Sequence, residues 1–261
     1  SNVICLSGGC AYNGTANGKI LANSNFKQIW IPPAPSDSGS AIGAALHLYH
    51  YNGGKKRPKN TSPYLGPHYT NNVVELELDK FKEEIYFVKK NHSELIPIIS
   101  KEITEGNVIG WFEGRMEFGA RALGNRSILA NPCDPQMKAR LNRLVKKREG
   151  FRPFAPMILE EHVHEYFNMP INQPTSRYMQ VVAECKKPLE FPAIVHVDGT
   201  SRVQTVPIGN SGIRKLLEAW YNETGCPMLL NTSLNIRGEP MVDTRADADR
   251  FTQEYGVTVC S

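Results

Sequence analysis

The chain has 261 residues, long enough to bury a substantial core and compatible with one large domain or two ordinary ones. Its hydrophobic content of 41% and charged content of 21% are those of a globular protein and argue against a disordered chain. No apolar run approaches the roughly 18 residues of a membrane helix, and the first residues lack the features of a signal peptide. We therefore expect a soluble, cytoplasmic protein that does not cross a membrane.

The first fifty residues predict two short strands and one helix. An apolar run from Val3 to Leu6 precedes a polar loop through Asn13 and Asn17, and a second strand spans Gln28 to Ile31. A helix is expected from Ser36-Asp37-Ser38 to about His50. These elements are too few to close a core, so we expect this segment to be the end of a larger domain.

Residues 51–72 are rich in Gly, Pro, Asn and Lys without apolar periodicity, which predicts a linker. Beyond it we expect a helix capped by Ser93, a buried strand from Val108 to Phe112, and a helix that begins at Asp134-Pro135. That helix carries an apolar stripe: Met137, Leu141, Leu144 and Val145.

The remainder alternates strands with helices. A helix from Ser211 to Gly225 and a last helix from about Arg245 to Glu254 are expected. Strands are predicted at 157–159, 178–183, 193–197, 202–206 and 228–230, with 193–197 and 202–206 forming a hairpin at Asp198-Gly199-Thr200. The pattern favours an α/β or α+β fold on a mixed sheet.

Basic charge is concentrated between Gly114 and Arg152, where ten Lys or Arg residues stand against three acids. The net charge of this segment is +7, whereas that of the whole chain is +4, so the other residues sum to −3. Several arginines lie among glycines, which lets backbone amides and guanidinium groups approach one anion closely. The segment predicts a phosphate site. A solvated helix face and a nucleic-acid patch are the alternatives that composition leaves open.

The basic residues form two groups along the chain, one on the loop after a strand and one at a helix end, and they could bind two anionic groups. They are Arg115, Arg121 and Arg126, then Lys146, Arg148 and Arg152. Asn231 to Asn235 follow a predicted strand, where side chains commonly line a ligand crevice. An ordinary Asx or ST turn is the alternative there.

Four blocks, GRMEFGARALGNRSILANP, REGFRPFAP, HVDGTSRVQTV and NTSLNIRGEPMV, resemble the C-terminal part of the O-carbamoyltransferases that modify antibiotics and nodulation factors. The family's downstream domain resembles the YrdC-like fold, a mixed twisted sheet whose members bind ATP and form a carbamoyl- or threonylcarbamoyl-adenylate. The K-x-R and S-x-N patterns of that fold occur here as Lys146-x-Arg148 and Ser233-x-Asn235.

The opening segment resembles the end of the family's upstream, actin/hexokinase-like domain. LSGGCAYNGTANGKI is similar to its nucleotide loop, which implies that Gly8, Gly9 and Asn13 lie near phosphate or ribose. PAPSDSGSAIGAAL is similar to a helix start that supplies a metal-binding aspartate, which implies Asp37 on a divalent metal, with Fe²⁺ a candidate. The family's histidine ligands come from an earlier segment. The implied domains are 1–52, a linker at 53–72, and 73–261.

The resemblance implies that carbamoyl phosphate and ATP, with Mg²⁺, yield carbamoyl-adenylate, and that the upstream domain transfers the carbamoyl group to a hydroxyl of a small-molecule acceptor. The implied catalytic residues are Arg115, Arg121, Lys146, Arg148 and Ser233, and those that bind substrate or ATP are Arg126, Arg152, Arg202, Asn231 and Asn235.

Two other functions are alternatives to this enzyme. An RNA-binding module is disfavoured because the rest of the chain is net negative and the arginines lie in glycine loops instead of among exposed aromatics. A relic that binds nucleotide without turnover is the second alternative, and the sequence does not distinguish it from an enzyme.

Overall fold

The computed structural model describes residues 1–57, 62–69, 90–173 and 175–260. Parts of the predicted linker, 58–61 and 70–72, lie outside the described residues, as do the first residues of the second predicted domain, 73–89. Within the described part of the chain, no helix is both long and apolar enough to span a bilayer.

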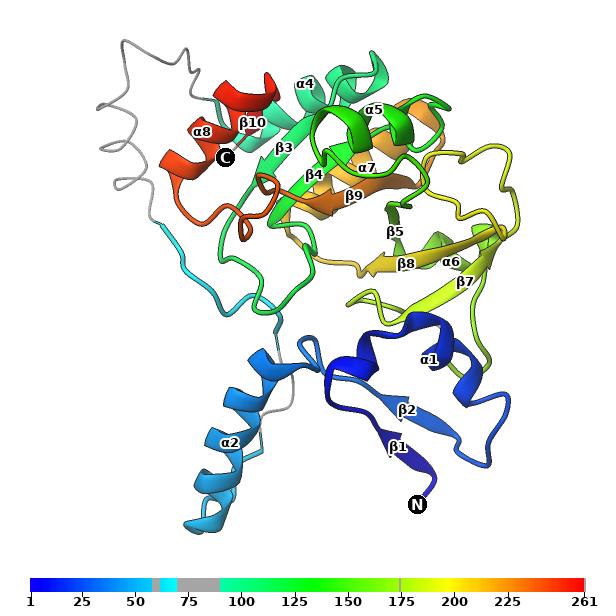
Figure 1. Ribbon diagram of the computed structural model, residues 1–261, viewed down its shortest axis with the longest axis vertical. Coiled ribbons are helices and arrows are strands. Elements are labelled where there is room, and N and C mark those ends of the chain that lie inside the picture. The colour runs from blue at the N-terminus through cyan, green and yellow to red at the C-terminus, as the bar shows by residue number, and fades with distance from the viewer. Residues whose placement is uncertain (58–61, 70–89, 174, 261) are drawn as a thin grey trace.

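The N-terminal unit, residues 1–51, contains a two-stranded parallel sheet, one 3-10 helix and two α-helices (Figure 1). Its elements are β1 (Val3–Cys5), the 3-10 helix η1 (Gly9–Tyr12), α1 (Gly14–Ile20), β2 (Gln28–Trp30) and α2 (Asp37–Tyr51). The predicted polar loop through Asn13 and Asn17 was wrong, because Asn13 begins a helix there. Its side-chain oxygen accepts a hydrogen bond from the Ala16 amide at 3.0 Å, which is the usual N-cap arrangement.

The larger part of the chain is built on one mixed sheet in the order β10-β3-β4-β9-β5-β8-β7-β6. The pairs β10–β3 and β5–β8 are parallel and the other neighbours are antiparallel. The predicted α/β architecture on a mixed sheet is therefore confirmed. The strands are β3 (Ile109–Phe112), β4 (Arg126–Ala130), β5 (Ala155–Leu159), β6 (Phe167–Asn168), β7 (Val181–Cys185), β8 (Thr200–Val206), β9 (Met228–Ser233) and β10 (Val259–Cys260).

Helices flank this sheet and bury its apolar side chains. The helices α4 (His92–Thr104) and α7 (Gly212–Thr224) pack on each other, with α4 against β3 and α7 against β5 and β9. Trp111, Leu129 and Trp220 are almost completely buried in the resulting core. The remaining helices are α5 (Met137–Leu144), η2 (Glu160–His162), α6 (Val163–Tyr166) and α8 (Arg245–Tyr255).

Several predicted elements differ from the structure. Residues 193–197 form turns instead of a strand, and the antiparallel partner of β8 is β7, which begins only at Val181. Ala193 and Ile194 are nevertheless buried, so the apolar pattern was read correctly but assigned to the wrong element. The strand β4 was missed, because its arginine and serine start resembles a loop.

Some helix and strand ends also differ from the predicted ones. The cap of α4 is Asn91, not Ser93: Asn91 and Glu94 form a capping box, with each side chain bonded to the other's amide. Asp134 makes an Asx turn that precedes α5, and the helix itself begins at Met137. In that helix Leu144 is 51% exposed, so it does not belong to the buried stripe. Strand β9 runs to Ser233 and therefore includes three residues predicted to follow it.

The N-terminal unit packs directly on the edge region of the large sheet, where α1 lies against β7. Side chains placed on Gly14 and Gly18 would come within 3.1 to 3.2 Å of Val182 atoms, so these glycines permit the close approach. The Asn17 amide donates to the Gln180 carbonyl at 2.8 Å, and the Gln180 amide donates to the Ile31 carbonyl at 3.2 Å. In contrast, α2 projects away from the sheet and buries none of its residues (Figure 1).

Candidate anion-binding site

Lys146 joins the end of α5 to the end of β9. Its ammonium donates to Asn235 Oδ1 at 2.7 Å, to Ser233 Oγ at 3.1 Å and to the Ser233 carbonyl. Ser233 Oγ in turn donates to Asn235 Oδ1 at 2.7 Å. The structure thus brings together the K-x-R lysine and both polar residues of the S-x-N pattern. All three partners of the ammonium are neutral oxygens.

A tight turn after α5 positions this lysine. The amide of Lys146 donates to the Leu141 carbonyl at 2.9 Å, and the amide of Arg148 donates to the Asn142 carbonyl at 3.0 Å. Between them, Lys147 adopts a φ of 44°, which reverses the chain. The turn presents Lys146 to the end of β9, and it returns Arg148 to Asn142 of α5.

Asn142 organises the segment that follows and was not singled out in the sequence. Its side chain is fully buried, with the amide donating to the carbonyls of Gly150 and Arg152 at 3.2 and 2.9 Å. Its Oδ1 accepts a hydrogen bond from Arg148 Nε at 2.7 Å. A polar residue on the apolar face of a basic helix is the sequence signal that could have identified it.

Burial, together with the nearby charge of Arg148, lowers the pKa of Lys146 to about 7. A lysine in a purely structural role would gain from a carboxylate partner, yet none contacts Lys146 among the described residues. The site therefore favours an anion. A bound anion would stabilise the protonated amine and raise its pKa toward the ordinary value of lysine.

Arg202 lies within electrostatic range of Arg121 and of Arg148, and Arg148 lies within range of Lys146. Burial lowers the pKa of Arg202 to about 10, and the charges of Arg121 and Arg148 act in the same direction. Burial is also the main cause that lowers the pKa of Arg121 and of Arg148. The Nε atoms of Arg121 and Arg202 are buried without a hydrogen-bond partner among the described residues. We refer to Arg121, Lys146, Arg148 and Arg202 as the basic cluster.

Several other arginines of the fold are instead paired with acids. Arg214 bonds Glu161 and Glu218, Arg245 bonds Asp249, and Arg250 bonds Glu239. The basic cluster thus differs from these pairs, because none of its cations bonds an acid among the described residues. Unpaired buried charge is costly unless a ligand supplies the counter-charge, so the arrangement favours anion binding.

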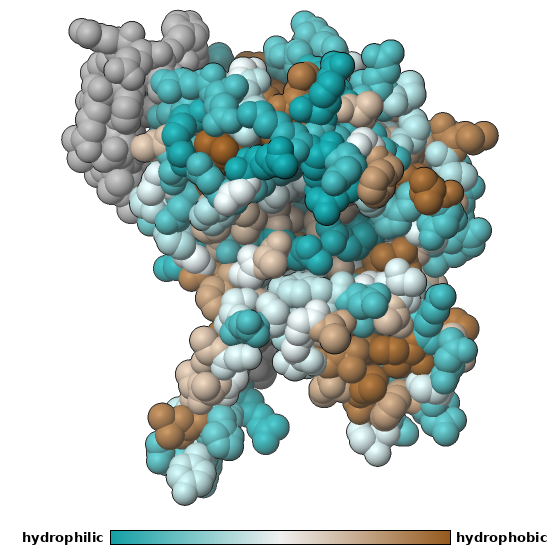
Figure 2. All heavy atoms as spheres, viewed as in Figure 1, coloured by the Kyte–Doolittle hydropathy of each residue, from teal (hydrophilic) through white to brown (hydrophobic). Residues whose placement is uncertain are grey.

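An open groove of about 760 Å³ adjoins the cluster and is lined mainly by cations: Arg143, Lys146, Lys147, Arg148, Arg152 and Arg237, with Ala139, Glu149 and Gly150. Arg152 forms an ion pair with Glu149 at 3.3 Å. Figure 2 shows hydrophilic residues gathered on this face, over α5 and the loop after it. The groove extends the basic surface enough to accommodate more than one phosphate group.

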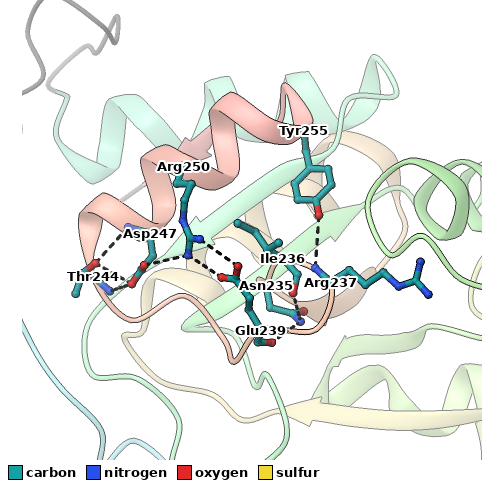
Figure 3. Close-up of polar contacts among 8 residues, drawn as sticks. All are labelled: Asn235, Ile236, Arg237, Glu239, Thr244, Asp247, Arg250 and Tyr255. Atoms are coloured by element: carbon teal, nitrogen blue, oxygen red, sulfur yellow. Dashed lines mark hydrogen bonds and ion pairs between the residues drawn. The ribbon is translucent and has the colours of Figure 1, made fainter.

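The loop between β9 and α8 places Asn235 and Arg237 beside the groove (Figure 3). The Asn235 amide donates to the carbonyls of Ile236 and Glu239, both at 3.1 Å, while Glu239 bonds Arg250. The Arg237 amide donates to Tyr255 Oη at 3.5 Å. The Arg237 side chain points away from the other residues drawn in Figure 3, toward the groove.

Glu117 shapes the glycine-rich loop between β3 and β4, residues 113–125. The sequence reasoning did not identify this role. It is 3% exposed, and its Oε1 accepts hydrogen bonds from the amides of Leu123 and Asn125 at 2.6 and 2.8 Å. Gly119 and Gly124 have φ angles of 120° and 112°, which ordinary side chains rarely tolerate. Glu117 thus bonds the backbone of this loop and forms no ion pair with Arg121.

Three other predicted residues use their side chains within the protein. Arg126 is fully buried, stacks on the Phe112 ring at 3.5 Å and donates to the carbonyls of Glu113 and Asn125 at 3.0 and 2.8 Å. The Asn231 amide donates to Gln204 Oε1 at 2.8 Å, while its Oδ1 has no partner among the described residues. Arg115 is exposed and donates to the Gly66 carbonyl at 3.0 Å. Their predicted ligand roles stay predictions.

The residues of the predicted nucleotide loop lie in the N-terminal unit. Gly8 has a φ of 92° and both Gly8 and Gly9 are exposed, with open space where a side chain would be. Asn13 caps α1. Asp37, the predicted metal ligand, is exposed at the start of α2, and the described residues contain no group of three or more metal-binding side chains. Asp37 alone does not constitute a metal site.

Comparisons with known proteins also divide the chain into an N-terminal and a C-terminal part. Residues 1–46 match the family profile "Carbamoyltransferase N-terminus" and residues 100–260 match "Carbamoyltransferase C-terminus". The nodulation protein NolNO of Sinorhizobium fredii is 42% identical over 94% of this chain and 36% of its own length. The 3'-hydroxymethylcephem-O-carbamoyltransferase of Amycolatopsis lactamdurans is 32% identical over 97% of this chain and 46% of its own length. This chain therefore spans less than half of each of these relatives.

Among solved structures, full-length HypF in its phosphate- and nucleotide-bound form aligns with 63% of this chain and 24% of its own length, at 20% identity and a TM-score of 0.47. The two family matches together include the residues of the basic cluster and residues 1–46 of the N-terminal unit that packs beside it. The chain belongs to the carbamoyltransferase family.

Proposed function

We propose that the basic cluster binds ATP and carbamoyl phosphate and promotes formation of carbamoyl-adenylate. The observation that carries this proposal is the set of four buried or half-buried cations, Arg121, Lys146, Arg148 and Arg202, to which no carboxylate of the described residues is bonded. Both substrates are polyanions, and their phosphates would otherwise repel each other. Fixed cations in a partly dehydrated site are what such a reaction requires.

The proposed reaction has two chemical steps. Carbamoyl phosphate first reacts with water, so that its carbonyl–oxygen–phosphorus bridge breaks and carbamate and inorganic phosphate result. A carbamate oxygen then attacks the α-phosphorus of ATP, the bond to the bridging oxygen breaks, and pyrophosphate leaves with its electron pair. The cations stabilise the charge that develops on the leaving pyrophosphate.

The chain's own residues would act as follows. Lys146 would exchange one of its neutral partners for a phosphate oxygen, while Ser233 and Asn235 hold its amine at the end of β9. Arg148 and Arg202 would provide paired planar donors, and the groove beyond Arg148 would hold the triphosphate. Within the described ranges no carboxylate bonds the cluster, so Mg²⁺ would arrive on the ATP phosphates, where it would neutralise part of their charge.

We assign the second reaction, transfer of the carbamoyl group to a hydroxyl of a small-molecule acceptor, to the actin/hexokinase-like domain that residues 1–52 resemble at its end. The relatives are more than twice as long as the part of them that this chain covers, which supports placing that step outside these residues. Asp37 would contribute to a divalent metal site there with ligands from other segments. The A. lactamdurans relative, named as an O-carbamoyltransferase, supports the class of acceptor.

The proposal is tested by exchange of radiolabelled pyrophosphate into ATP. With this chain, ATP, Mg²⁺ and carbamoyl phosphate, we expect labelled ATP to accumulate only when carbamoyl phosphate is present. Tight ATP binding without exchange would support the nucleotide-binding relic instead. If neither exchange nor ATP binding occurs, the basic cluster has another ligand and the proposal is wrong.

A further inference from the structure

Tyr12, in the N-terminal unit, contacts a residue of the basic cluster. Tyr12 ends η1, and its ring lies under the guanidinium of Arg121, with 4.7 Å between Arg121 Cζ and the ring centre. Arg121 comes from the glycine-rich loop of the large sheet, over a hundred residues away in sequence. The contact therefore joins a cation of the proposed site to a separate part of the fold.

Arg121 has little else to hold it in place. It forms no hydrogen bond or ion pair with the part of the chain that the structure describes, and its Nε is buried without a partner. Arg202 lies close enough to repel it, since each carries a positive charge. The face of an aromatic ring attracts a guanidinium, and this attraction strengthens where water is excluded. Tyr12 is thus the group that keeps Arg121 directed at the cluster.

The surrounding backbone is shaped to allow this contact. A side chain on Gly119, two residues before Arg121, would lie 2.8 Å from Ala34 Cβ and 3.5 Å from Tyr12 Oη, so only a glycine permits the loop and the N-terminal unit to approach this closely. The position of the unit is fixed independently by the Asn17–Gln180 and Gln180–Ile31 hydrogen bonds. Val182, against which α1 packs, pairs with Arg202 across the sheet. One docking interface therefore sets the positions of Tyr12, Arg121 and Arg202.

We propose that Tyr12 is a positioning residue of the anion site, and that the N-terminal unit thereby takes part in binding the polyphosphate ligand. The inference rests on the proposed function, because it assumes that ATP occupies the basic cluster. The ring is the active part of the side chain. Tyr12 Oη is buried and makes no hydrogen bond with the described residues, so removal of the hydroxyl should not destabilise the fold.

The test measures ATP affinity by calorimetry for the wild-type chain and for Tyr12→Phe, Tyr12→Met, Arg121→Ala and the Tyr12→Met/Arg121→Ala double variant. Tyr12→Phe keeps the aromatic face and should bind within about twofold of wild type, whereas Tyr12→Met fills similar space without it and should bind about 5- to 20-fold more weakly. The double variant should bind no more weakly than Arg121→Ala alone, because both changes remove one interaction. Tyr51→Met, on the exposed part of α2, is the matched control and should equal wild type.

Thermal unfolding shows whether each variant is folded. If Tyr12→Met is not folded, the affinity of Tyr12→Phe still tests the inference. Wild-type affinity in Tyr12→Met, an equal loss in Tyr12→Phe, or multiplying losses in the double variant would overturn the inference and leave the proposed function standing. Failure of the wild-type chain to bind ATP would overturn both.

Discussion

The ammonium of Lys146 lies 2.7 Å from Asn235 Oδ1 and joins positions 89 residues apart in the sequence. One comes from the turn after α5 and the other from the loop after β9, so the fold of the large sheet brings them together. Since this oxygen is neutral, it supplies no negative charge to balance the buried ammonium of Lys146. This relationship makes the site sensitive to pH and to anions.

The first prediction concerns pH. The folded-state pKa of Lys146, about 7, is below that of an unfolded lysine, so the folded protein loses this charge as pH rises through 7. We expect ATP affinity to fall between about pH 6 and pH 8.5, and binding near neutrality to take up a proton. Calorimetry in buffers of different ionisation enthalpy measures that uptake. Lys146→Arg, which stays charged, should abolish it, and a pH-independent wild-type affinity would contradict the assignment.

The same group makes a second prediction, for stability without ligand. Between about pH 7 and pH 10 the unfolded chain binds one more proton at this lysine than the folded chain does, so the free energy of unfolding should rise with pH over that window. Urea titrations of wild type and of Lys146→Met give the difference. In Lys146→Met this contribution should be absent, and an identical pH dependence in the two proteins would show that Lys146 is not buried as described.

A third prediction compares two buried arginines. Arg202 has no acid partner in the part of the chain that the structure describes, so Arg202→Met should leave the unligated protein as stable as wild type or stabilise it by about 1 kcal/mol, while ATP binding weakens about tenfold or more. Arg214 bonds two glutamates, so Arg214→Met should cost about 3 kcal/mol of unfolding free energy and spare ATP affinity in the folded fraction. Denaturant unfolding and calorimetry measure both. Equal destabilisation by the two changes would contradict the proposed division of roles.

Asn142 provides a fourth prediction. Asn142→Ala removes three hydrogen bonds of a fully buried side chain and leaves two carbonyls and Arg148 Nε without partners. We expect a loss of about 2 to 4 kcal/mol in unfolding free energy and weaker ATP binding, because the segment that carries Arg148 and Arg152 loses its support. The neighbouring, exposed Arg143→Ala should affect stability by less than about 0.5 kcal/mol. Equal stability of the two variants would be inconsistent with this role.

Gly119 provides a fifth. Gly119→Ala places a methyl group 2.8 Å from Ala34 Cβ at a φ of 120°, so the N-terminal unit must shift away from the large sheet. Hydrogen exchange should show faster exchange in α1 and β7. Gly150→Ala, where a side chain meets open space at an ordinary φ, is the control. Unchanged protection in Gly119→Ala would mean that the unit is not docked as described.

Sequence reasoning predicted the elements whose signals are local. Ser211 and Gly225 bound α7 as expected, with the Ser211 side chain accepting the Arg214 amide and Gly225 in the left-handed region. The buried strand β3 was likewise evident from its apolar run. Caps and apolar periodicity act within a few residues, and they are readable without the rest of the fold.

The errors arose where tertiary contacts decide the structure. The buried run Ala193–Val195 resembles a strand, but β7 occupies the place beside β8, and the run packs as turns. The end of β9 was placed too early because Asn231 and Ser233 are polar, although their neighbours on β4 pair with them. Which cations lie together, and the supporting roles of Glu117 and Asn142, depend on the same long-range pairing. The domain boundaries at 52 and 72 stay predictions.

The central claim is that cations left without acids receive the phosphates of the substrates. The most direct measurement is a crystal structure of the chain with ATP, Mg²⁺ and carbamoyl phosphate. We expect phosphate oxygens within about 3 Å of Lys146, Arg148 and Arg202, with Ser233 and Asn235 beside them. Phosphates bound elsewhere, with Lys146 still bonded to its three neutral oxygens, would contradict the account.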